Sequence, residues 1–246
     1  MKEREPYKII SKELGSSLET GAKLAHVGKV IADIENVPIT RQQELGIATI
    51  GGAQRVYDSA FDAHDILKSK SNGKIILDMI NGSAQHTDQL DPSLVKAITL
   101  AHDNLNPESF QAFKGLTEAQ IKSISQREAI PLEESFLHEI TEEKGAYTVL
   151  VLALQINPNL DTKKRHCYEQ LGYLVQLVDD YYDKELDKKE GIITLASIWD
   201  NAKIINEIKS QNKKVREGFI RNYEPYKLQE LFVYMDTLLA SIGILN

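Results

Sequence analysis

Cysteine is almost absent from this sequence, since Cys167 is the single one among 246 residues. A disulfide needs two cysteines and a Cys-based zinc site needs several, so neither can form within one chain. Glycine (14) and proline (7) are also sparse. They fall mostly between periodic segments, and alternating, strand-like runs are nearly missing. These absences exclude a disulfide scaffold and predict an all-α protein.

Long apolar runs are missing as well. The longest, residues 146–156, is too short to span a bilayer, and the charged stretch 1–14 lacks the apolar core of a secretion signal. We therefore expect a cytoplasmic protein without a transmembrane segment. The formal net charge of −7 disfavours a nucleic-acid partner, because phosphate backbones select for an excess of Lys and Arg.

Helical periodicity covers most of the chain. The proportions of apolar residues (42%) and charged residues (26%) are those of an ordinary globular protein, and no interdomain linker is visible. We predict one helical domain over residues 1–246. Thr40 and Asp91-Pro92 are expected helix starts, and Gly115 and Gly145 are expected breaks. The expected helices cover residues 18–35, 53–70, 74–80, 91–102, 108–113, 118–127, 132–142, 147–155, 162–187, 193–217 and 227–244.

The most informative segment is residues 171–187, where an apolar helical run continues into an acidic cluster without a break. Asp179, Asp183 and Asp187 stand at i, i+4 and i+8, which places their carboxylates in one row along a helix, with Asp180 beside it. Like charges at this spacing repel each other by a few tenths of a kcal/mol per pair. Hard divalent cations, which prefer oxygen ligands, would offset that repulsion.

A solvated acidic face is the alternative interpretation of this segment. The residues that precede the acids are strongly apolar, namely Leu171, Leu174, Val175 and Val178. They indicate a largely buried helix, in which an acidic row is unfavourable without metal ions or partners. The pattern therefore favours a metal site.

A second acidic segment occurs much earlier in the chain. Asp58, Asp62 and Asp65 stand at i, i+4 and i+7, which predicts one helical face, and Arg55 lies one turn before them. An Asp and an Arg one turn apart are usually a surface ion pair, so the segment is weak evidence alone. Two acidic rows far apart in sequence can, however, face each other across a bundle cavity, as the ligands of bundle-core metal sites do.

Together the two segments resemble the class I isoprenoid synthases, which comprise trans-prenyltransferases, squalene/phytoene synthases and terpene synthases. Residues 179–183 have the DDxxD form and follow Gln176, as in many prenyl synthase second motifs. Asp179, Asp183 and Asp187 also have the spacing of the terpene synthase NSE triad, and the surrounding sequence looks closest to bacterial large-terpene synthases. The resemblance implies a helical bundle with a central cavity, where two Asp-rich motifs bind three Mg²⁺ ions and the diphosphate of a prenyl diphosphate. Members of these families are often homodimers.

The resemblance also implies roles for particular residues. The expected catalytic residues are Asp58, Asp62, Asp179 and Asp183. The expected Mg²⁺ ligands are Asp58, Asp62, Asp65, Asp179, Asp180, Asp183 and Asp187. The expected substrate contacts are Arg55, Lys144, Gln176, Tyr181 and Lys188. Because Ser59 follows Asp58, the first motif departs from DDxxD. We expect ionisation followed by cyclisation or elimination, with chain elongation or head-to-head condensation as the alternative.

Two interpretations from other classes remain open. His64-Asp65 and His102-Asp103 are His–Asp dipeptides of the kind found in all-helical HD-type metal phosphohydrolases, with His26 upstream. The atypical first motif also fits a non-catalytic helical scaffold that kept only the fold. Mg²⁺-dependent binding of a diphosphate would distinguish an enzyme from a scaffold.

Overall fold

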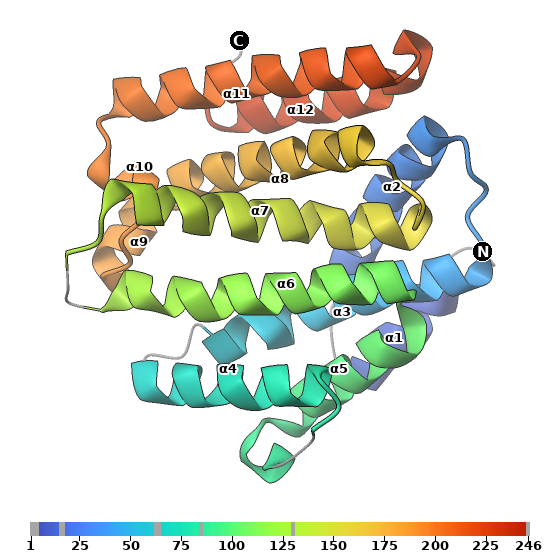
Figure 1. Ribbon diagram of the computed structural model, residues 1–246, viewed down its shortest axis with the longest axis vertical. Helices are drawn as coiled ribbons and strands as arrows, with labels where there is room; N and C mark the ends of the chain where they lie inside the picture. Colours follow the sequence, from blue (N-terminus) through green and yellow to red (C-terminus); the bar gives the residue numbers. More distant parts are fainter. Residues whose placement is uncertain (1–4, 15–17, 62–64, 84–85, 129–130, 245–246) are drawn as a thin grey trace. The chain divides into compact units, whose positions relative to one another are not determined.

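The computed structural model describes residues 5–14, 18–61, 65–83, 86–128 and 131–244. Every regular element in these ranges is an α-helix or a short 3-10 helix (Figure 1), which confirms the all-α prediction. No helix in the same ranges is long and apolar enough to cross a membrane. The chain divides into two compact units, Met1–Ile124 with Val151–Asn159, and Ser125–Leu150 with Leu160–Asn246.

The first unit is built around one central helix, α3, which packs against α1, α2 and α5, while α4 packs against α6. Its core consists of fully buried aliphatic and aromatic side chains such as Ile34, Ile47, Phe61, Ile76 and Leu94. Its helices are α1 (Glu5–Leu14), α2 (Leu18–Glu35), α3 (Arg41–Phe61), α4 (Ile66–Ile80), α5 (Pro92–Asn104) and α6 (Pro107–Ser123), with a 3-10 turn at Thr87–Gln89.

Side-chain caps fix several helix starts where the sequence predicts them. Thr40 and Gln43 form a capping box at the start of α3: the Gln43 amide donates to Thr40 Oγ1 (3.3 Å), and the Thr40 amide donates to Gln43 Oε1 (2.7 Å). Asp91 accepts the Ser93 amide (2.8 Å) at the start of α5, with Pro92 in the first turn. Both predicted starts are confirmed.

Glycines account for several of the wrong helix boundaries. The loop expected over residues 68–74 lies inside α4, and a Cβ added to Gly73 would stand 2.7 Å from Ile121 Cγ1 of α6. Gly115 is likewise buried inside α6, which is one continuous helix. At Gly73 the missing side chain gives room to α6, and neither glycine ends its own helix. Helix α1, with Tyr7, Ile10 and Leu14 buried, was not predicted.

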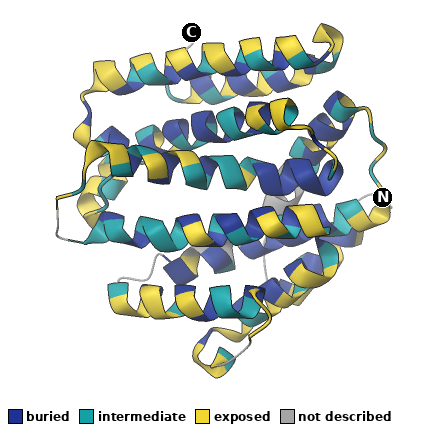
Figure 2. Cartoon of the chain, viewed as in Figure 1, coloured by how far each residue is buried: buried dark blue, intermediate teal, exposed yellow. Residues whose placement is uncertain are grey.

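The second unit is organised around α8, whose residues before Asp179 are largely buried (Figure 2). Helix α8 packs against α10, α11 and α12, and α11 is tied to α12 by the Arg216–Asp236 ion pair (2.5 Å). The unit contains the first part of α7 (Glu134–Ile156), α8 (Thr162–Tyr182), α9 (Lys184–Glu190), α10 (Leu195–Ile198), α11 (Asn201–Asn222) and α12 (Gln229–Ser241), with a 3-10 turn at Pro225–Leu228.

Helices α7 and α8 approach each other most closely at a pair of glycines. A Cβ on Gly145 would clash with the backbone carbonyl of Gly172, and a Cβ on Gly172 would clash with that of Gly145. The helix break expected at Gly145 is therefore wrong, because α7 runs through it and uses it for packing. This contact sets how the residues of α7 meet the acidic end of α8.

The single helix predicted over 162–187 is divided at Asp183, which ends α8 and begins α9. The helix predicted over 193–217 is likewise two helices. Thr194 forms a capping box with Ser197 at the start of α10, and the Asp200 side chain accepts the Lys203 amide at the start of α11. These caps separate the two helices at Trp199.

Candidate functional site

The acidic row of the second unit keeps its register across the α8–α9 junction. The Asp183 amide donates to the Asp179 carbonyl (2.9 Å), and the Asp187 amide donates to the Asp183 carbonyl (2.9 Å). Both bonds have the i→i+4 spacing of an α-helix, although α8 itself ends at Tyr182 and the Leu186 amide donates to the Asp183 carbonyl (2.8 Å) in a tighter turn. The spacing predicted for the three aspartates is therefore retained despite the division into two helices.

Asp180 differs from its neighbours because it points into the protein and is only 7% exposed. Gln176 Nε2 donates to its Oδ1 (2.7 Å), and Thr141 Oγ1 of α7 donates to its Oδ2 (3.3 Å). Burial raises the pKa of Asp180 to about 6, although Lys144 and these two hydrogen bonds favour the charged form. Asp180 on α8 is thus hydrogen-bonded both within its own helix and to α7.

Asp179 and Asp187 also have raised pKa values. Burial raises the pKa of Asp187 to about 7, and the charges of Asp180 and Asp183 raise it further. The pKa of Asp179, which reaches solvent, is raised by its partial burial and by Asp183. Lys144 opposes all three shifts. The row therefore carries more negative charge near neutral pH than Lys144 balances.

This donor set fits magnesium in its chemistry, because Mg²⁺ prefers carboxylate oxygens. Among the residues that the structure describes, no three His, Cys, Asp or Glu side chains are gathered closely enough to hold one ion. That arrangement is compatible with Mg²⁺, which is commonly bound by one or two carboxylates while water and substrate phosphates complete its shell. Asp179, Asp183 and Asp187 are the residues that would hold such ions.

The expected substrate contacts in this unit have different surroundings. Lys144 is half-buried on α7 and acts electrostatically on Asp179, Asp180 and Asp187. Lys188 is exposed on α9 and pairs with Glu185 (3.5 Å). Tyr181 is half-buried at the end of α8. Of these three, Lys144 has the clearest electrostatic link to the acidic row.

The first acidic segment is only partly described. Asp58 lies on α3, but its side chain and that of Arg55 are outside the description, as is the whole of Asp62. Asp65 caps α4 and accepts the amides of Leu67 (2.9 Å) and Lys68 (3.1 Å). The expectation that Asp65 shares one helix with Asp58 is therefore wrong, because α3 ends at Phe61 and Asp65 starts the next helix. That this segment faces the acidic row of α8 stays a prediction.

Those residues of the HD-type alternative that the structure describes show no metal-binding arrangement. His102 is exposed near the end of α5, where its Nδ1 lies 3.4 Å from Asp103 Oδ1. His26 is exposed on α2, and His64 lies outside the described residues. Within the described ranges no third His, Cys, Asp or Glu joins His102 and Asp103 in a group that could hold a metal. The structure gives this alternative no support.

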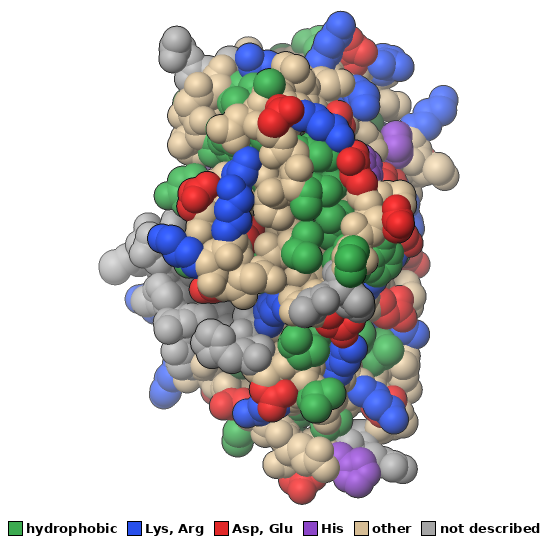
Figure 3. Space-filling view, turned by 90° about the vertical axis from the view of Figure 1, so that its left-hand side faces the viewer, with side chains coloured by type: hydrophobic (Ala, Val, Ile, Leu, Met, Phe, Trp, Pro, Cys, Tyr) green, Lys and Arg blue, Asp and Glu red, His purple; other side chains and the backbone are tan. Residues whose placement is uncertain are grey.

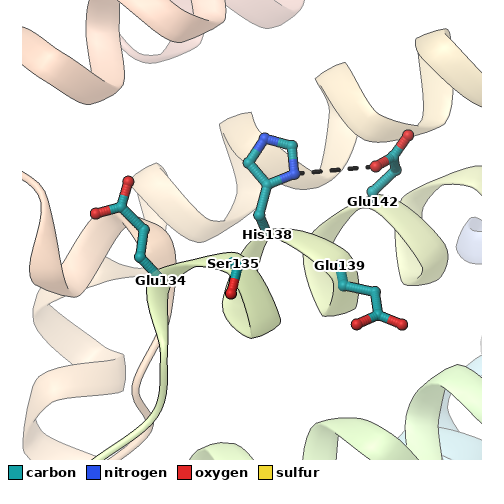
Figure 4. Close-up of a pocket in the computed structure, with 5 residues that line it drawn as sticks. All are labelled: Glu134, Ser135, His138, Glu139 and Glu142. Carbon is teal, nitrogen blue, oxygen red and sulfur yellow. Dashed lines mark ion pairs between the residues drawn. The ribbon is translucent and has the colours of Figure 1, made fainter.

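A shallow surface pocket of about 460 Å³ lies on α7, apart from the row of aspartates (Figure 4). Its five lining residues all come from the first turns of that helix. Two of them, His138 and Glu142, point toward one another, with 3.9 Å between Nδ1 and Oε2. The other ring nitrogen of His138 is 2.8 Å from the buried Tyr173 hydroxyl, which links the pocket to α8. Since one helix supplies the whole lining, the pocket is a surface hollow and not the candidate site.

Comparison with known proteins finds a solved structure with a similar fold. The all-α architecture expected from the sequence is shared by a solved structure. The chain is similar to a dehydrosqualene synthase whose crystal structure was determined in complex with ligand. The TM-score is 0.59, the match covers 98% of this chain and 92% of that chain, and 14% of residues are identical. No family model and no curated protein sequence matches the chain.

The raised pKa values predict how stability depends on pH without divalent cations. A carboxyl whose pKa is higher in the folded state binds more protons when folded, so stability is lost as pH rises through that pKa. This loss runs from about pH 4, the ordinary carboxyl value, up to about pH 6 for Asp180 and about pH 7 for Asp187. We expect Asp187→Asn to raise the free energy of unfolding at pH 8 by about 1 kcal/mol, a value reduced for solvent screening because Asp187 is half-buried.

Urea unfolding at pH 5, 6, 7 and 8 in EDTA measures this effect. The stabilisation by Asp187→Asn should grow with pH, and added Mg²⁺ should stabilise the wild type more than the variant. Asp88→Asn, at an exposed position in the first unit, serves as the control. A difference between Asp187→Asn and wild type that stays constant from pH 5 to pH 8 would contradict the predicted charge excess.

Proposed function

We propose that the protein is an Mg²⁺-dependent class I isoprenoid enzyme that ionises a prenyl diphosphate. The observation that carries the proposal is the acidic row of α8 and α9 in a chain with the isoprenoid synthase fold. Burial and the charge of Asp183 raise the pKa values of Asp179 and Asp187, with Lys144 as the opposing charge. Such a row favours divalent cations, and cations bound there attract a diphosphate.

In this proposal the residues of the row have distinct tasks. Asp179, Asp183 and Asp187 would hold the ions. Lys144 donates a charge-assisted hydrogen bond to the diphosphate. When bound, Mg²⁺ would neutralise the negative charge that develops on the leaving diphosphate. The first acidic segment, through Asp58 and Asp62, is proposed to supply the remaining ligands, with Arg55 at the diphosphate.

Exposed apolar side chains beside the row support a substrate with a hydrocarbon chain. Tyr182, Leu186 and Ile198 are 70%, 52% and 46% exposed on α8, α9 and α10. Figure 3 shows the side toward which α9 and α10 lie in Figure 1, and hydrophobic side chains reach solvent there among acidic and basic ones. Apolar and charged surface in close proximity suits an amphipathic prenyl diphosphate.

Two reaction outcomes are distinguished by different observations. The sequence around residues 179–183, which looks closest to large-terpene synthases, favours cyclisation or elimination of one substrate molecule. The structural similarity to a dehydrosqualene synthase favours the alternative, head-to-head condensation of two substrate molecules. Both begin with metal-assisted departure of diphosphate, so the same acidic row serves either outcome.

Product analysis tests the proposal and separates these outcomes. The purified protein is incubated with Mg²⁺ and prenyl diphosphates from C10 upward, and the extracted products are identified by mass spectrometry. A hydrocarbon with the carbon number of the substrate would establish cyclisation or elimination, and a product with twice that number would establish condensation. Recovery of unchanged substrate at every chain length would contradict the enzymatic proposal and favour a helical scaffold.

A further inference from the structure

Asp180 stands apart from the other acids of the row in both direction and environment. Asp179 is exposed and Asp183 and Asp187 are half-buried, whereas Asp180 is buried with each of its oxygens accepting a hydrogen bond. One donor, Gln176, lies one turn earlier on α8. The other, Thr141, comes from α7 and is itself buried. Asp180 is therefore the acid of this row that links the helix to its neighbour.

The glycine contact between α7 and α8 explains why Thr141 meets Asp180. Thr141 lies one turn before Gly145 on α7, while Asp180 lies two turns after Gly172 on α8. The two contacts run in opposite sequence order along the helices, so α7 and α8 are antiparallel. Because the glycine backbones approach closely, side chains near them can reach across from one helix to the other, as Thr141 Oγ1 does to Asp180 Oδ2 (3.3 Å).

Stability alone does not account for a carboxylate at this place. A buried carboxylate is desolvated, and the hydrogen bonds that it gains commonly only offset that penalty. An apolar side chain of similar volume is often neutral or stabilising at such a site. The hydrogen bond between Asp180 and Thr141 adds a preferred orientation of α8. It forms at one rotation of the helix about its axis, whereas apolar packing is compatible with several.

We propose that Asp180 is a positioning residue and not a metal ligand: held by Thr141, it fixes the rotation of α8 against α7. That rotation determines where Asp179 and Asp183, on either side of it in sequence, present their carboxylates to ions. The inference rests on the proposed function and deepens it. It also assigns a role to Thr141, which touches neither ion nor diphosphate.

The first part of the test measures the contact itself by urea unfolding in EDTA. Thr141→Val leaves a buried carboxylate oxygen without its donor and should destabilise the protein. Adding Asp180→Leu removes the acceptor as well and should recover most of that loss. The two substitutions should be coupled by about fivefold or more in the unfolding equilibrium constant. If the two substitutions change the free energy of unfolding independently, Thr141 and Asp180 do not form this hydrogen bond, whatever the protein's activity.

The second part measures binding of inorganic pyrophosphate by calorimetry at fixed Mg²⁺. Loss of a group that orients metal ligands weakens metal sites by about 10- to 100-fold, so Thr141→Val should weaken pyrophosphate binding by about tenfold. Thr141→Ser keeps the hydroxyl and should bind like the wild type. The matched control is Thr148→Val, an exposed α7 threonine that donates only to the Lys144 carbonyl.

The remaining outcomes decide between this inference and the proposed function. In one outcome, the unfolding data show that Thr141 and Asp180 are coupled while folded Thr141→Val still binds pyrophosphate like the wild type. That result would overturn the positioning role and show that the hydrogen bond contributes to stability alone. Loss of binding in Asp180→Asn with normal binding in Thr141→Val would identify Asp180 as a direct ligand and overturn the inference. Failure of the wild type to bind pyrophosphate with Mg²⁺ would overturn the proposed function and the positioning role together, and the unfolding data would still report on the contact.

Discussion

Replacement of Asp183 by asparagine is expected to lower Mg²⁺-dependent pyrophosphate release by about a hundredfold or more. Asp183 stands at the centre of the row, where its charge raises the pKa of both Asp179 and Asp187. Asparagine keeps the size and removes the charge, so the site loses one anionic ligand. Loss of one group that stabilises developing charge reduces turnover by about 100- to 1,000-fold in well-studied enzymes.

The release rate is measured with a coupled pyrophosphate assay over a range of Mg²⁺ concentrations. The control variant is Glu185→Gln, which changes an exposed carboxylate on α9 that pairs with Lys188. This variant should retain most of the wild-type rate. Equal rates for Asp183→Asn and Glu185→Gln would mean that the acidic row does not bind the catalytic metal.

A substitution of Gly172 by alanine is expected to destabilise the protein by about 3 kcal/mol. The added Cβ would meet the carbonyl group of Gly145 and would stand 2.9 Å from Ala146 Cα. Backbone atoms cannot rotate away as a side chain can, so α7 and α8 must separate. Overpacking a tight contact typically lowers stability by about 1 to 3 kcal/mol, and a backbone clash belongs at the upper end.

Gly218→Ala is the matched control for this prediction. Gly218 lies inside α11 of the same unit, and a Cβ there would make an ordinary contact, 3.6 Å from Cys167 Sγ. Alanine favours a helix interior over glycine by about 0.5 to 1 kcal/mol, so this variant should be slightly more stable. Urea unfolding measures both variants. Equal stability of Gly172→Ala and wild type would show that the two helices do not meet at these glycines.

Local sequence signals predicted the class of fold and several helix boundaries. The 3.6-residue periodicity gave an all-α protein, and the polar caps Thr40 and Asp91 marked the starts of α3 and α5. Such signals succeed because a cap and its helix are neighbours in sequence. Asp65 carried the same kind of signal for α4, but the acidic series drew the interpretation to metal binding and the cap was not predicted. Its role as a metal ligand stays a prediction.

Glycines were harder to interpret, because a glycine that breaks a helix and one that admits a neighbouring helix look alike in one sequence. Gly73 and Gly145 are both of the second kind. What distinguishes them is the partner across the contact, Ile121 in one case and Gly172 in the other. These partners lie 48 and 27 residues away in the chain, and no local pattern connects them.

The row of aspartates in the candidate site could be predicted from the sequence, but the contact that holds its helix against α7 could not. Asp179, Asp183 and Asp187 form a regular series, which periodicity alone brings to one side of a helix. The prediction treated Asp180 as one more metal ligand, and the sequence contains no signal for its contact with Thr141. That contact depends on the approach of α7 to α8, which is a property of the folded chain.

The measurement that tests the account most directly is pyrophosphate release by the wild-type protein from prenyl diphosphates of increasing chain length, with Mg²⁺ or with EDTA. We expect release from at least one substrate with Mg²⁺ and none with EDTA, because the acidic row needs cations to accept a diphosphate. No release at any chain length, together with no Mg²⁺-dependent binding of pyrophosphate, would contradict the account. The chain would then share the fold of isoprenoid synthases without their chemistry.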